Sequence, residues 1–475
     1  MKTNSKTCII ATVGPASSDQ NTLERLIDAG VNVFRLNFSH GEPEDHAAVV
    51  ERIRAAEKRT VRAIGILQDL QGPKIRTTRF ADGPVTLTEG NTFRLTCDDD
   101  SPGDENRVGV TYPGLARDTK AGETLLLADG RLELEVTEVQ GETLVTRVVR
   151  GGPLSNNKGI NVPGSDLKIP ALSEQDAAHI KVGAELNVDW VAMSFVRSRD
   201  DILLARHYLD RYASRAKLMA KIEKPSAIER FADILEEADG IMIARGDLGV
   251  ELSVDRVPMV QKKLIRLCRE AGKPVVTATQ MLESMTTSPT PTRAEASDVA
   301  NAIFDGTDAV MLSAETAVGD YPTETVGVMN QIALSVEADE GYQKAMSETQ
   351  ISVEASLADS VASAACQMAS AINAKVIVTF SSSGSTALRV ARHRVTQYVL
   401  AITPNRESYQ QLAMSWGIDP VLAEDIRDSD EMVARANEVI TQTGIAQPGD
   451  YYVITAGVPF GVSGTTNLIR AEIVT

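Results

Sequence analysis

The most constraining feature of the sequence is a repeated alternation of short apolar runs with amphipathic helical patterns. Eight runs rich in β-branched residues are each followed by a segment whose apolar residues recur at helical spacing. Strands that alternate with helices pair in parallel, and eight such units fit a closed (β/α)₈ TIM barrel. An open doubly wound sheet is the alternative. The runs occupy 8–14, 31–39, 61–70, 189–196, 216–223, 240–249, 273–281 and 307–315.

Two further regions interrupt or follow this pattern. Residues 71–168 alternate apolar with polar positions between Gly and Asp-Gly turns, which predicts an inserted β-barrel module. It would leave the barrel at the carboxyl end of the third strand, where active sites form, and so would act as a mobile lid. The predicted domains are a discontinuous catalytic barrel (1–70 and 169–344), the all-β lid (71–168) and a C-terminal α/β regulatory domain (345–475).

Composition excludes several classes of protein. The chain has 48 Lys+Arg against 65 Asp+Glu and a net charge of −17, which argues against nucleic-acid or anionic-membrane partners. No run approaches the length of a transmembrane helix, and the N-terminal apolar stretch is typical of a strand rather than a signal peptide. Four widely spaced cysteines indicate free thiols. We therefore expect a cytoplasmic protein.

Polar residues gather where the apolar runs end. In a barrel, these carboxyl ends face the active site. Residues two apart on a strand share a face, so Arg35, Asn37 and Ser39 should point together, as should Lys221 and Glu223. The other polar residues at predicted strand ends are His40, Asp69, Arg245, Asp247, Thr279 and Glu315.

Glu223 and Asp247 form the best candidate metal-binding pair. Two carboxylates without nearby Cys or His suit a hard cation, Mg²⁺ or Mn²⁺, although strand-end salt bridges are the alternative. Lys221 beside them suggests binding of a phosphoryl group or enolate, with Schiff-base chemistry as the rival. The backbone N–H groups of Gly246 and Asp247 could bind a carboxylate if a helical turn begins there.

The sequence lacks both common nucleotide-binding signatures, the P-loop and the dinucleotide fingerprint. A nucleotide would have to be held by the barrel rim and the lid. A second candidate phosphate site is the strand, Ser/Gly loop and helix start at 379–394, with Arg389 and Arg392 on the helix. An ordinary capped helix start is the alternative. A real phosphate site this far from the barrel would indicate regulation.

Several long motifs resemble the pyruvate kinase family. They include RLNFSHG, DLQGPKIR, GGPLSNNKGIN, MAKIEKPSAI, ARGDLGVE, TATQMLESM and the tail GTTNLIR, and they run in order almost end to end, through the inserted module. The resemblance implies transfer of the phosphoryl group of phosphoenolpyruvate to ADP, giving pyruvate and ATP in the last step of glycolysis. It also implies a homotetramer with an allosteric site for a phosphorylated effector.

The same resemblance implies roles for individual residues. Thr279 would lie near the carbon at which the enolate is protonated, with a relayed water as the ultimate donor. Arg35 and Lys221 would hold the transferring phosphoryl group; Glu223 and Asp247 would bind Mg²⁺; Gly246, Asp247 and Thr279 would hold the substrate carboxylate; Asn37, His40, Arg76 and Lys158 would face the nucleotide.

Residue 74 departs from the commoner family pattern. Many members need K⁺, and they carry an acidic residue where this chain, with Leu70 and Gln71, has Lys74, as in a bacterial subgroup without that requirement. We hypothesise that Lys74 supplies the positive charge of K⁺, so that K⁺ is not required; a solvated hinge lysine is the alternative. The residues that match the K⁺ site are Asn37, Ser39, Asp69 and the carbonyl of Leu70.

The sequence leaves alternatives open for the identity of the effector and for the reaction. The loop contains no Lys or Arg, so a sugar monophosphate, a nucleotide and fructose bisphosphate are all compatible effectors. A metal-dependent barrel lyase or aldolase acting on a pyruvate enolate, or an inactive metabolite-binding regulator, would compete with the kinase. The lid, Arg35 beside Asn37 and the extra C-terminal domain favour the kinase. The loop comprises Ser381, Ser382, Ser383, Gly384, Ser385 and Thr386.

Overall fold

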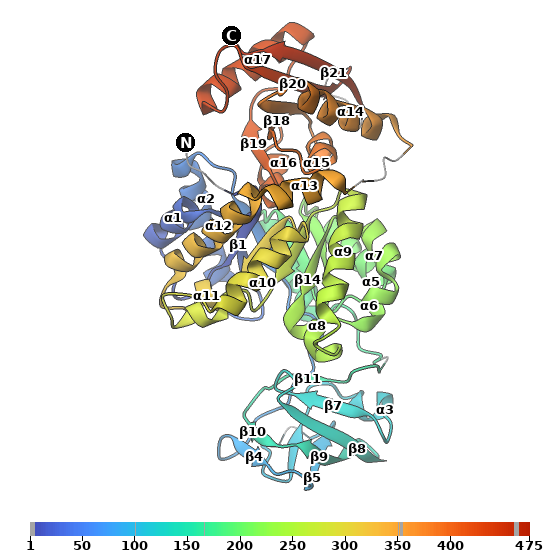
Figure 1. The fold of residues 1–475 in the computed structure, drawn as a ribbon. Helices are drawn as coiled ribbons and strands as arrows, with labels where there is room; N and C mark the ends of the chain where they lie inside the picture. The colour runs from blue at the N-terminus through green and yellow to red at the C-terminus, as the bar shows by residue number, and fades with distance from the viewer. Residues whose placement is uncertain (1–4, 100, 166, 350, 352–354, 460–464) are drawn as a thin grey trace.

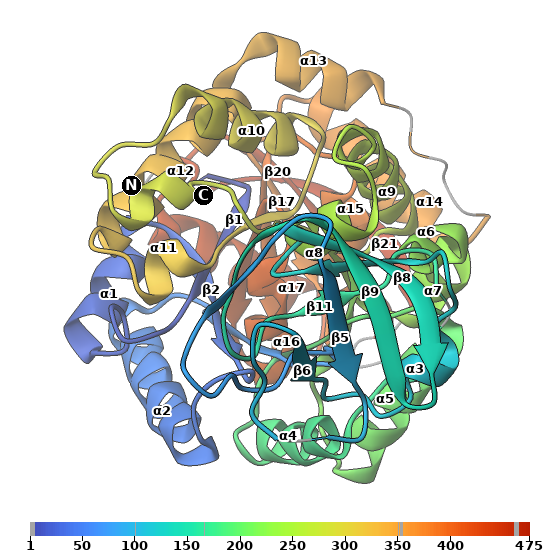
Figure 2. The same cartoon turned by 90° about the horizontal axis from the view of Figure 1, so that it is seen from below.

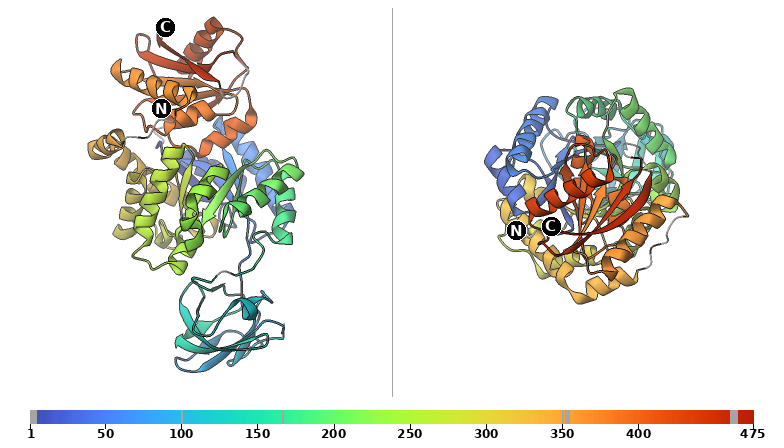
Figure 3. Two further views of the ribbon diagram at one scale, coloured as in Figure 1. Left: turned by 90° about the vertical axis from the view of Figure 1, so that its right-hand side faces the viewer. Right: turned by 90° about the horizontal axis from the view of Figure 1, so that it is seen from above.

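The fold was obtained as a computed structural model that describes residues 5–475 except 100, 166, 350, 352–354 and 460–464. Three parts follow one another along the long axis of the molecule (Figures 1 and 3). The all-β lid lies at one end, the barrel in the middle and the C-terminal α/β domain at the other end. These parts match the three predicted domains, while the predicted boundaries themselves remain predictions.

The central part is a closed barrel of eight parallel strands in the order β1-β16-β15-β14-β13-β12-β3-β2. This confirms the predicted barrel and excludes the open doubly wound sheet. Most residues of these strands are buried, as expected for strands covered by helices on one face and packed on the other. The strands are β1 (Cys8–Thr12), β2 (Val31–Asn37), β3 (Gly65–Asp69), β12 (Trp190–Met193), β13 (Lys217–Ile222), β14 (Gly240–Ala244), β15 (Val275–Ala278) and β16 (Ala309–Leu312).

Helices surround the barrel, as the view from the lid end shows (Figure 2). Local capping fixes several helix starts: the Ser173 side chain accepts from the backbone N–H of Asp176, and Thr292 does the same for Glu295. The helices are α1 (Gln20–Ala29), α2 (Pro43–Thr60), α4 (Glu174–Glu185), α5 (Arg199–Arg211), α6 (Pro225–Glu229), α7 (Phe231–Glu237), α8 (Arg245–Glu251), α9 (Val257–Ala271), η1 (Glu283–Thr286), α10 (Arg293–Phe304), α11 (Ala314–Ala317), α12 (Pro322–Ala338) and α13 (Glu340–Glu348).

The inserted module lies between β3 and α4 and has its own apolar core, which includes Phe93, Leu125 and Leu134. The sequence predicted an all-β module, a β-barrel, here. The described residues form a six-stranded sheet, β11-β7-β8-β9-β5-β6, and a two-stranded pair, β10-β4. The strands are β4 (Val85–Leu87), β5 (Thr92–Thr96), β6 (Arg107–Gly109), β7 (Thr124–Leu127), β8 (Leu132–Gln140), β9 (Thr143–Arg150), β10 (Gly152–Leu154) and β11 (Ile160–Asn161), with helix α3 (Leu115–Asp118).

The C-terminal domain is a five-stranded sheet, β19-β18-β17-β20-β21, with helices packed against it. It lies against the amino ends of the barrel strands: Cys8 at the start of β1 and Trp190 at the start of β12 both bond to its backbone. The lid and this domain therefore occupy opposite faces of the barrel. The elements are α14 (Leu357–Ala371), β17 (Val376–Phe380), α15 (Ser385–Ala391), β18 (Tyr398–Thr403), α16 (Arg406–Gln411), η2 (Leu412–Met414), β19 (Ile418–Leu422), α17 (Ser429–Thr443), β20 (Tyr451–Gly457) and β21 (Thr466–Ile473).

Within the described part of the chain, the helices are too short or too polar to cross a bilayer. Gly464, the first residue of the tail motif GTTNLIR, lies outside the described residues.

Candidate active site

Asp69 is the centre of a buried charge cluster at the carboxyl ends of the barrel strands. Its side chain is 1% exposed, and it accepts hydrogen bonds from Arg35 Nε at 2.6 Å and from Lys221 Nζ at 3.0 Å. The parallel pairing of β2 with β3 places Asn37 opposite Asp69, which brings the two predicted strand ends together. Two cations from different strands thus meet on one carboxylate.

The charges of this cluster support one another. Burial alone would raise the pKa of Asp69, but Lys221 and Arg35 outweigh it and hold that pKa below its usual value. Burial likewise opposes the charge on Lys221, yet the carboxylates of Asp69 and Glu223 raise the pKa of its ammonium above the usual range. Lys221 is therefore cationic at neutral pH. The side chains of Arg35 and Lys221 are both 12% exposed, so an anion can reach them.

Lys221 and Glu223 lie on the same side of the strand end, as their spacing predicted. Lys221 Nζ lies 3.3 Å from Glu223 Oε1 and donates to Ser194 Oγ at 2.7 Å. The backbone N–H of Phe195, a residue with φ of 55°, donates to Glu223 Oε2 at 2.6 Å. The sequence reading missed Ser194 and Phe195, although Ser194 directly follows β12 and could have been found as the polar end of that strand.

Glu223 and Asp247 fit a hard divalent cation. Burial raises the pKa of Glu223, Lys221 lowers it and the negative charge of Asp247 raises it further, so a cation between the two carboxylates would relieve their repulsion. Among the residues that the structure describes, no group of three or more His, Cys, Asp or Glu side chains is arranged to hold a metal ion. Two protein carboxylates would leave several coordination positions for water and substrate oxygens, as Mg²⁺ prefers.

Gly246 and Thr279 meet beside this pair. Helix α8 begins at Arg245, so a helical turn does begin at this point, which is the condition for the Gly246 and Asp247 N–H groups to bind a carboxylate. The Gly246 N–H donates to Thr279 Oγ1 at 2.8 Å, and the carbonyl of Thr279 accepts from Arg245 Nη2 at 2.9 Å. Thr279 has φ of 72°, a left-handed conformation that is strained for a β-branched residue. The Thr279 hydroxyl and the backbone N–H of Gly246 thus lie next to each other in this conformation.

Lys74 reaches Asp247, one of the two candidate metal ligands, rather than the predicted K⁺ ligands. Its ammonium lies 3.0 Å from Asp247 Oδ1 and 3.9 Å from Asp129 Oδ1, and its side chain is 20% exposed. This is a paired and largely buried position, unlike that of a solvated hinge lysine. In the K⁺-site set, Asn37 Oδ1 accepts from the Ser39 N–H at 3.2 Å, and Asp69 is already bonded to two cations.

The residues predicted to face the nucleotide form two groups. Arg76 and Lys158 come together on adjacent lid segments: Arg76 pairs with Gly159, and the Thr77 N–H donates to the Lys158 carbonyl at 2.8 Å. His40 is exposed at the barrel rim, one turn beyond Asn37. Across the described residues, the structure shows no hydrogen bond or ion pair between the lid group and the rim group.

Two strand-end residues have other surroundings than the sequence suggested. Glu315 is buried and accepts from the backbone N–H groups of Ser313 at 2.6 Å and Leu282 at 3.2 Å, so it ties two loops together. Ser39 lies beyond the end of β2, where strand alternation no longer applies. The strand spacing that predicted a common face with Arg35 and Asn37 therefore does not extend to Ser39.

The candidate effector loop precedes helix α15 in the C-terminal domain. The Ser382 carbonyl accepts from Asn405 Nδ2 at 2.8 Å and Ser408 Oγ at 2.7 Å, and Gly384 takes φ of 79°. Arg392 is not free for a phosphate, because it bonds to the Asp359 carboxylate and to the Glu270 carbonyl. A cavity of about 280 Å³ is lined by Arg215, Ser382, Ser383, Asn405, Glu407 and Ser408.

The fold and the charges define a class of enzyme. A parallel barrel with two cations on a buried carboxylate, beside two further carboxylates, is suited to phosphoryl or enolate chemistry on an anionic substrate. During such a reaction negative charge develops on the substrate, and these cations can stabilise it.

Comparisons with known proteins identify the family. A family model for the pyruvate kinase barrel domain matches residues 4–326, and one for the pyruvate kinase alpha/beta domain matches 359–471. The chain is 45% identical to a pyruvate kinase of Methylorubrum extorquens, over 100% of this chain and 98% of that protein. A pyruvate kinase of Staphylococcus aureus is 43% identical, over 99% of this chain and 80% of that protein.

A solved structure of a pyruvate kinase from Cryptosporidium parvum has a TM-score of 0.93 and 33% identity, over 100% of this chain and 97% of that chain. The chain belongs to the pyruvate kinase family. It is a phosphotransferase, and the lyase or aldolase alternative is not favoured.

Proposed function

We propose that the chain transfers the phosphoryl group of phosphoenolpyruvate to ADP, giving pyruvate and ATP in the last step of glycolysis. The observation that carries this proposal is the convergence of Arg35 and Lys221 on Asp69, with Glu223 3.3 Å from Lys221. Arg35 and Lys221 would bind the transferring phosphoryl group, where their charges stabilise the transition state. Asp69 keeps both cations in place between turnovers.

The rest of the substrate fits the neighbouring donors. The Gly246 and Asp247 N–H groups and the Thr279 hydroxyl would hold the substrate carboxylate, since Gly246 and Thr279 already lie 2.8 Å apart. This orients the enolate beside Thr279 for protonation at carbon, with a water as the ultimate donor. Protonation of the enolate removes the nucleophile that could take the phosphoryl group back, and it thereby drives transfer to ADP.

Glu223 and Asp247 would hold Mg²⁺ or Mn²⁺. A bound divalent cation neutralises negative charge on the phosphoryl and enolate oxygens. The N–H of Phe195 fixes one Glu223 oxygen, which leaves the other directed toward Lys221 and the substrate. Replacing Glu223 by Gln should raise the Mg²⁺ concentration needed for activity; an unchanged Mg²⁺ requirement would remove Glu223 from the proposed ligand set.

The nucleotide would lie between the barrel rim and the lid. Asn37 and His40 would contact it from the rim, and Arg76 and Lys158 from the lid. Because these two groups sit on different domains, closure of the lid would bring them to the same ligand and exclude water that could otherwise accept the phosphoryl group.

We also propose that the enzyme works without K⁺. Lys74 places a positive charge 3.0 Å from Asp247, where an acidic residue would add a third negative charge to the metal-binding pair. Such a lysine would repel a nearby monovalent cation by about 1–4 kcal/mol at ~4 Å, depending on the effective dielectric constant. Asn37, Ser39, Asp69 and Leu70, the residues that match the K⁺ site, would then need no ion.

We further propose that the enzyme is regulated by an effector and assembles from several copies of the chain. A phosphorylated effector would bind at the loop 381–386, where Gly384 takes the left-handed conformation directly before α15. The chain would assemble as a homotetramer, as the family resemblance implies.

The proposed reaction is tested by following pyruvate and ATP together. Pyruvate release from phosphoenolpyruvate is measured by coupling to lactate dehydrogenase, with and without ADP and with and without Mg²⁺. Release should require both. Pyruvate formation that ignores ADP would contradict the kinase assignment and favour a lyase or phosphatase.

A further inference from the structure

Few polar contacts connect the lid to the barrel near the candidate active site. Lys74 bonds to Asp247, and Asn161 in β11 donates to Glu251 Oε1 at 2.9 Å. Arg197 Nη1 donates to the carbonyls of Leu167 at 3.1 Å and Ile169 at 3.0 Å. Each of these links joins the barrel to one of the two chain segments that enter and leave the lid.

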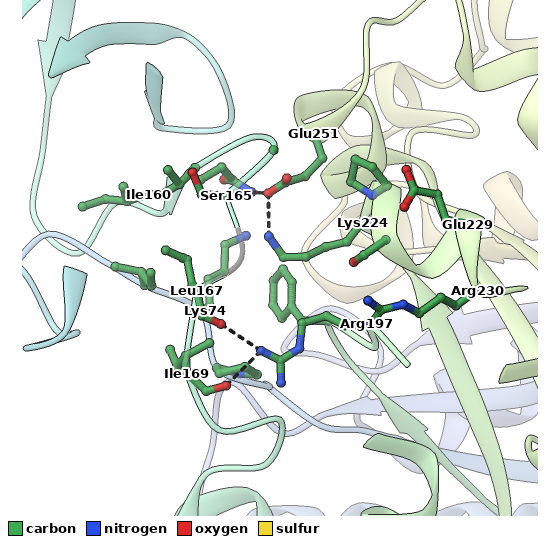
Figure 4. A pocket seen from close by; sticks show the side chains of 18 residues that line it. Lys74, Ile160, Ser165, Leu167, Ile169, Arg197, Lys224, Glu229, Arg230 and Glu251 are labelled. Carbon is green, nitrogen blue, oxygen red and sulfur yellow. Dashed lines mark hydrogen bonds and ion pairs between the residues drawn. The ribbon is translucent and has the colours of Figure 1, made fainter. Parts of the chain in front are cut away.

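A cavity separates the returning lid segment from the barrel wall beside these links. It measures about 290 Å³, and Figure 4 shows Ile160, Leu167 and Ile169 on its lid side, with Lys224 and Arg197 reaching across from the barrel. Close packing therefore does not fix the lid at this place. The few polar contacts must set its position.

Glu251 makes the most connected of these links. Its side chain is 1% exposed, and Oε1 accepts both from Asn161 Nδ2 at 2.9 Å and from Lys224 Nζ at 3.0 Å. Figure 4 shows Lys224 directed at Glu251 across the cavity edge. A buried carboxylate with one cation and one amide partner is costly to disturb, because loss of Lys224 would leave a buried charge unpaired and loss of Asn161 would remove a hydrogen bond from that charge.

Glu251 and its partner Lys224 each lie close in sequence to one of the two proposed metal ligands. Lys224 is the next residue after Glu223. Glu251 itself ends helix α8, four residues and about one turn after Asp247. The other partner, Asn161, belongs to the lid strand β11, which pairs with β7. One carboxylate thus connects the lid to the segments that carry both metal ligands.

We propose that Glu251 is a positioning residue that couples the position of the lid to the geometry of the metal-binding carboxylates. The inference rests on the proposed function, because it assumes that Glu223 and Asp247 bind the divalent cation. When the lid moves, the hydrogen bond from Asn161 displaces the side chain of Glu251. The displacement reaches Asp247 through α8 and Glu223 through Lys224, so that the metal site is in its best geometry only at one lid position.

The test measures Mn²⁺ binding to the full chain by electron paramagnetic resonance, without substrates, in single and double variants. Glu251→Gln keeps the size of the side chain but removes its charge, and it should weaken Mn²⁺ binding about tenfold, as outer-shell changes commonly do. Asn161→Ala should also weaken Mn²⁺ binding, although Asn161 lies in the lid. In the double variant, Asn161→Ala should add nothing to Glu251→Gln.

The non-additive result distinguishes coupling from simple loss of stability. A merely structural Glu251 would lower the thermal midpoint of unfolding while Asn161→Ala left Mn²⁺ affinity unchanged, or while the two effects on affinity added; either result overturns the proposal. If Glu251→Gln does not fold, Lys224→Met with Asn161→Ala tests the path to Glu223 alone: the two changes together should weaken Mn²⁺ binding by less than the product of their separate effects, and full additivity would overturn the proposal. Glu185→Gln, in the exposed Lys181–Glu185 pair, is the control and should leave Mn²⁺ binding unchanged.

A separate variant keeps this test distinct from that of the proposed function. Glu223→Gln should weaken Mn²⁺ binding strongly. If it does not, the metal site of the proposed function is wrong. If it does, but Asn161→Ala has no effect, only the coupling through Glu251 is wrong.

Discussion

At the scale of single residues, Asp69 holds together Arg35 and Lys221, the two cations that we propose bind the phosphoryl group. Without the carboxylate, Arg35 and Lys221 would be two like charges in a buried place. With it, the pKa of Lys221 stays above its usual range and that of Asp69 below its usual range. If these cations bind the substrate phosphoryl group, as proposed, they are already positioned before it arrives, which would lower the reorganisation needed for transfer.

Replacing Lys221 by Met tests this reading. The variant keeps the length of the side chain but removes the charge, so phosphoryl transfer should fall about 10²- to 10³-fold, the usual cost of one transition-state donor. The measurement is kcat in the coupled assay, with circular dichroism to confirm folding. Lys181→Met, at an exposed position on α4, is the matched control. A rate near that of the wild type would remove Lys221 from phosphoryl transfer.

Replacing Lys74 by Glu tests independence from K⁺. The change reverses the charge 3.0 Å from Asp247 and gives this position the acidic character of the commoner family pattern. Activity of the variant should rise at least several-fold when KCl replaces tetramethylammonium chloride at constant ionic strength. The wild type should show no such rise. Strong activation of the wild type by KCl would contradict the role given to Lys74.

At the scale of elements, the turn after β3 is tightly constrained where the lid begins. Gly72 has φ of 70°, and a Cβ there would lie 2.8 Å from the Ser194 Cβ and 2.9 Å from the Phe195 ring. Its N–H also donates to Asp176 Oδ1 at 3.2 Å. The turn thus fixes the lid entrance against the residues that position Lys221 and Glu223.

Gly72→Ala should therefore destabilise the chain by about 1–3 kcal/mol through overpacking, in addition to the cost of the left-handed conformation. Gly90→Ala is the control, because Gly90 has φ of 84° but nothing within 4 Å of its would-be Cβ. Urea unfolding compares the two variants. If both variants lose the same free energy of unfolding, the close contacts at Gly72 add no cost to that of the left-handed conformation.

The elements also show what sequence reasoning could reach. The eight barrel units were predictable because each buried strand is a continuous apolar run of β-branched residues with a helical partner. Helix α8 was missed because its seven residues contain two glycines and no apolar periodicity. Strand β19 was missed because Asp419 and Pro420 break the apolar pattern, and both are tolerated since β19 is an edge strand.

Most of the candidate site followed from strand ends, but its contacts did not. Lys74 and Asp247 are 173 residues apart, and only the path of the lid segment brings them to 3.0 Å. Glu315 has the sequence position of a site residue, yet it serves two backbone donors, because the loop after β16 turns back on itself. Side-chain partners of this kind depend on loop geometry that local patterns do not encode.

At the scale of the whole molecule, the barrel separates the lid from the C-terminal domain, and buried contacts join that domain to the barrel. Arg394 donates to Asp308 Oδ1 at 3.0 Å and to the Gly306 carbonyl at 2.6 Å, and its guanidinium lies 4.7 Å from the centre of the Trp416 ring. Any effector bound to the C-terminal domain would have to act through such contacts at the amino ends of the strands.

Arg394→Met should weaken this interface. It leaves Asp308 as a buried carboxylate without its cation, which costs about 3–5 kcal/mol. Differential scanning calorimetry should show a lower unfolding temperature and a C-terminal transition separated from that of the barrel. Arg435→Met, from the more exposed Arg435–Glu438 pair, should change the transition little. A single unshifted transition in Arg394→Met would contradict the structural role of the ion pair.

The fate of the phosphorus atom tests the central claim most directly. Phosphoenolpyruvate labelled with ³²P is mixed with excess enzyme, ADP and Mg²⁺, and the products are separated after a single turnover. The label should appear in the terminal phosphate of ATP, in the same amount as the pyruvate formed, and the Lys221→Met variant should form neither at a comparable rate. Label recovered as inorganic phosphate, in amounts independent of ADP, would contradict the account.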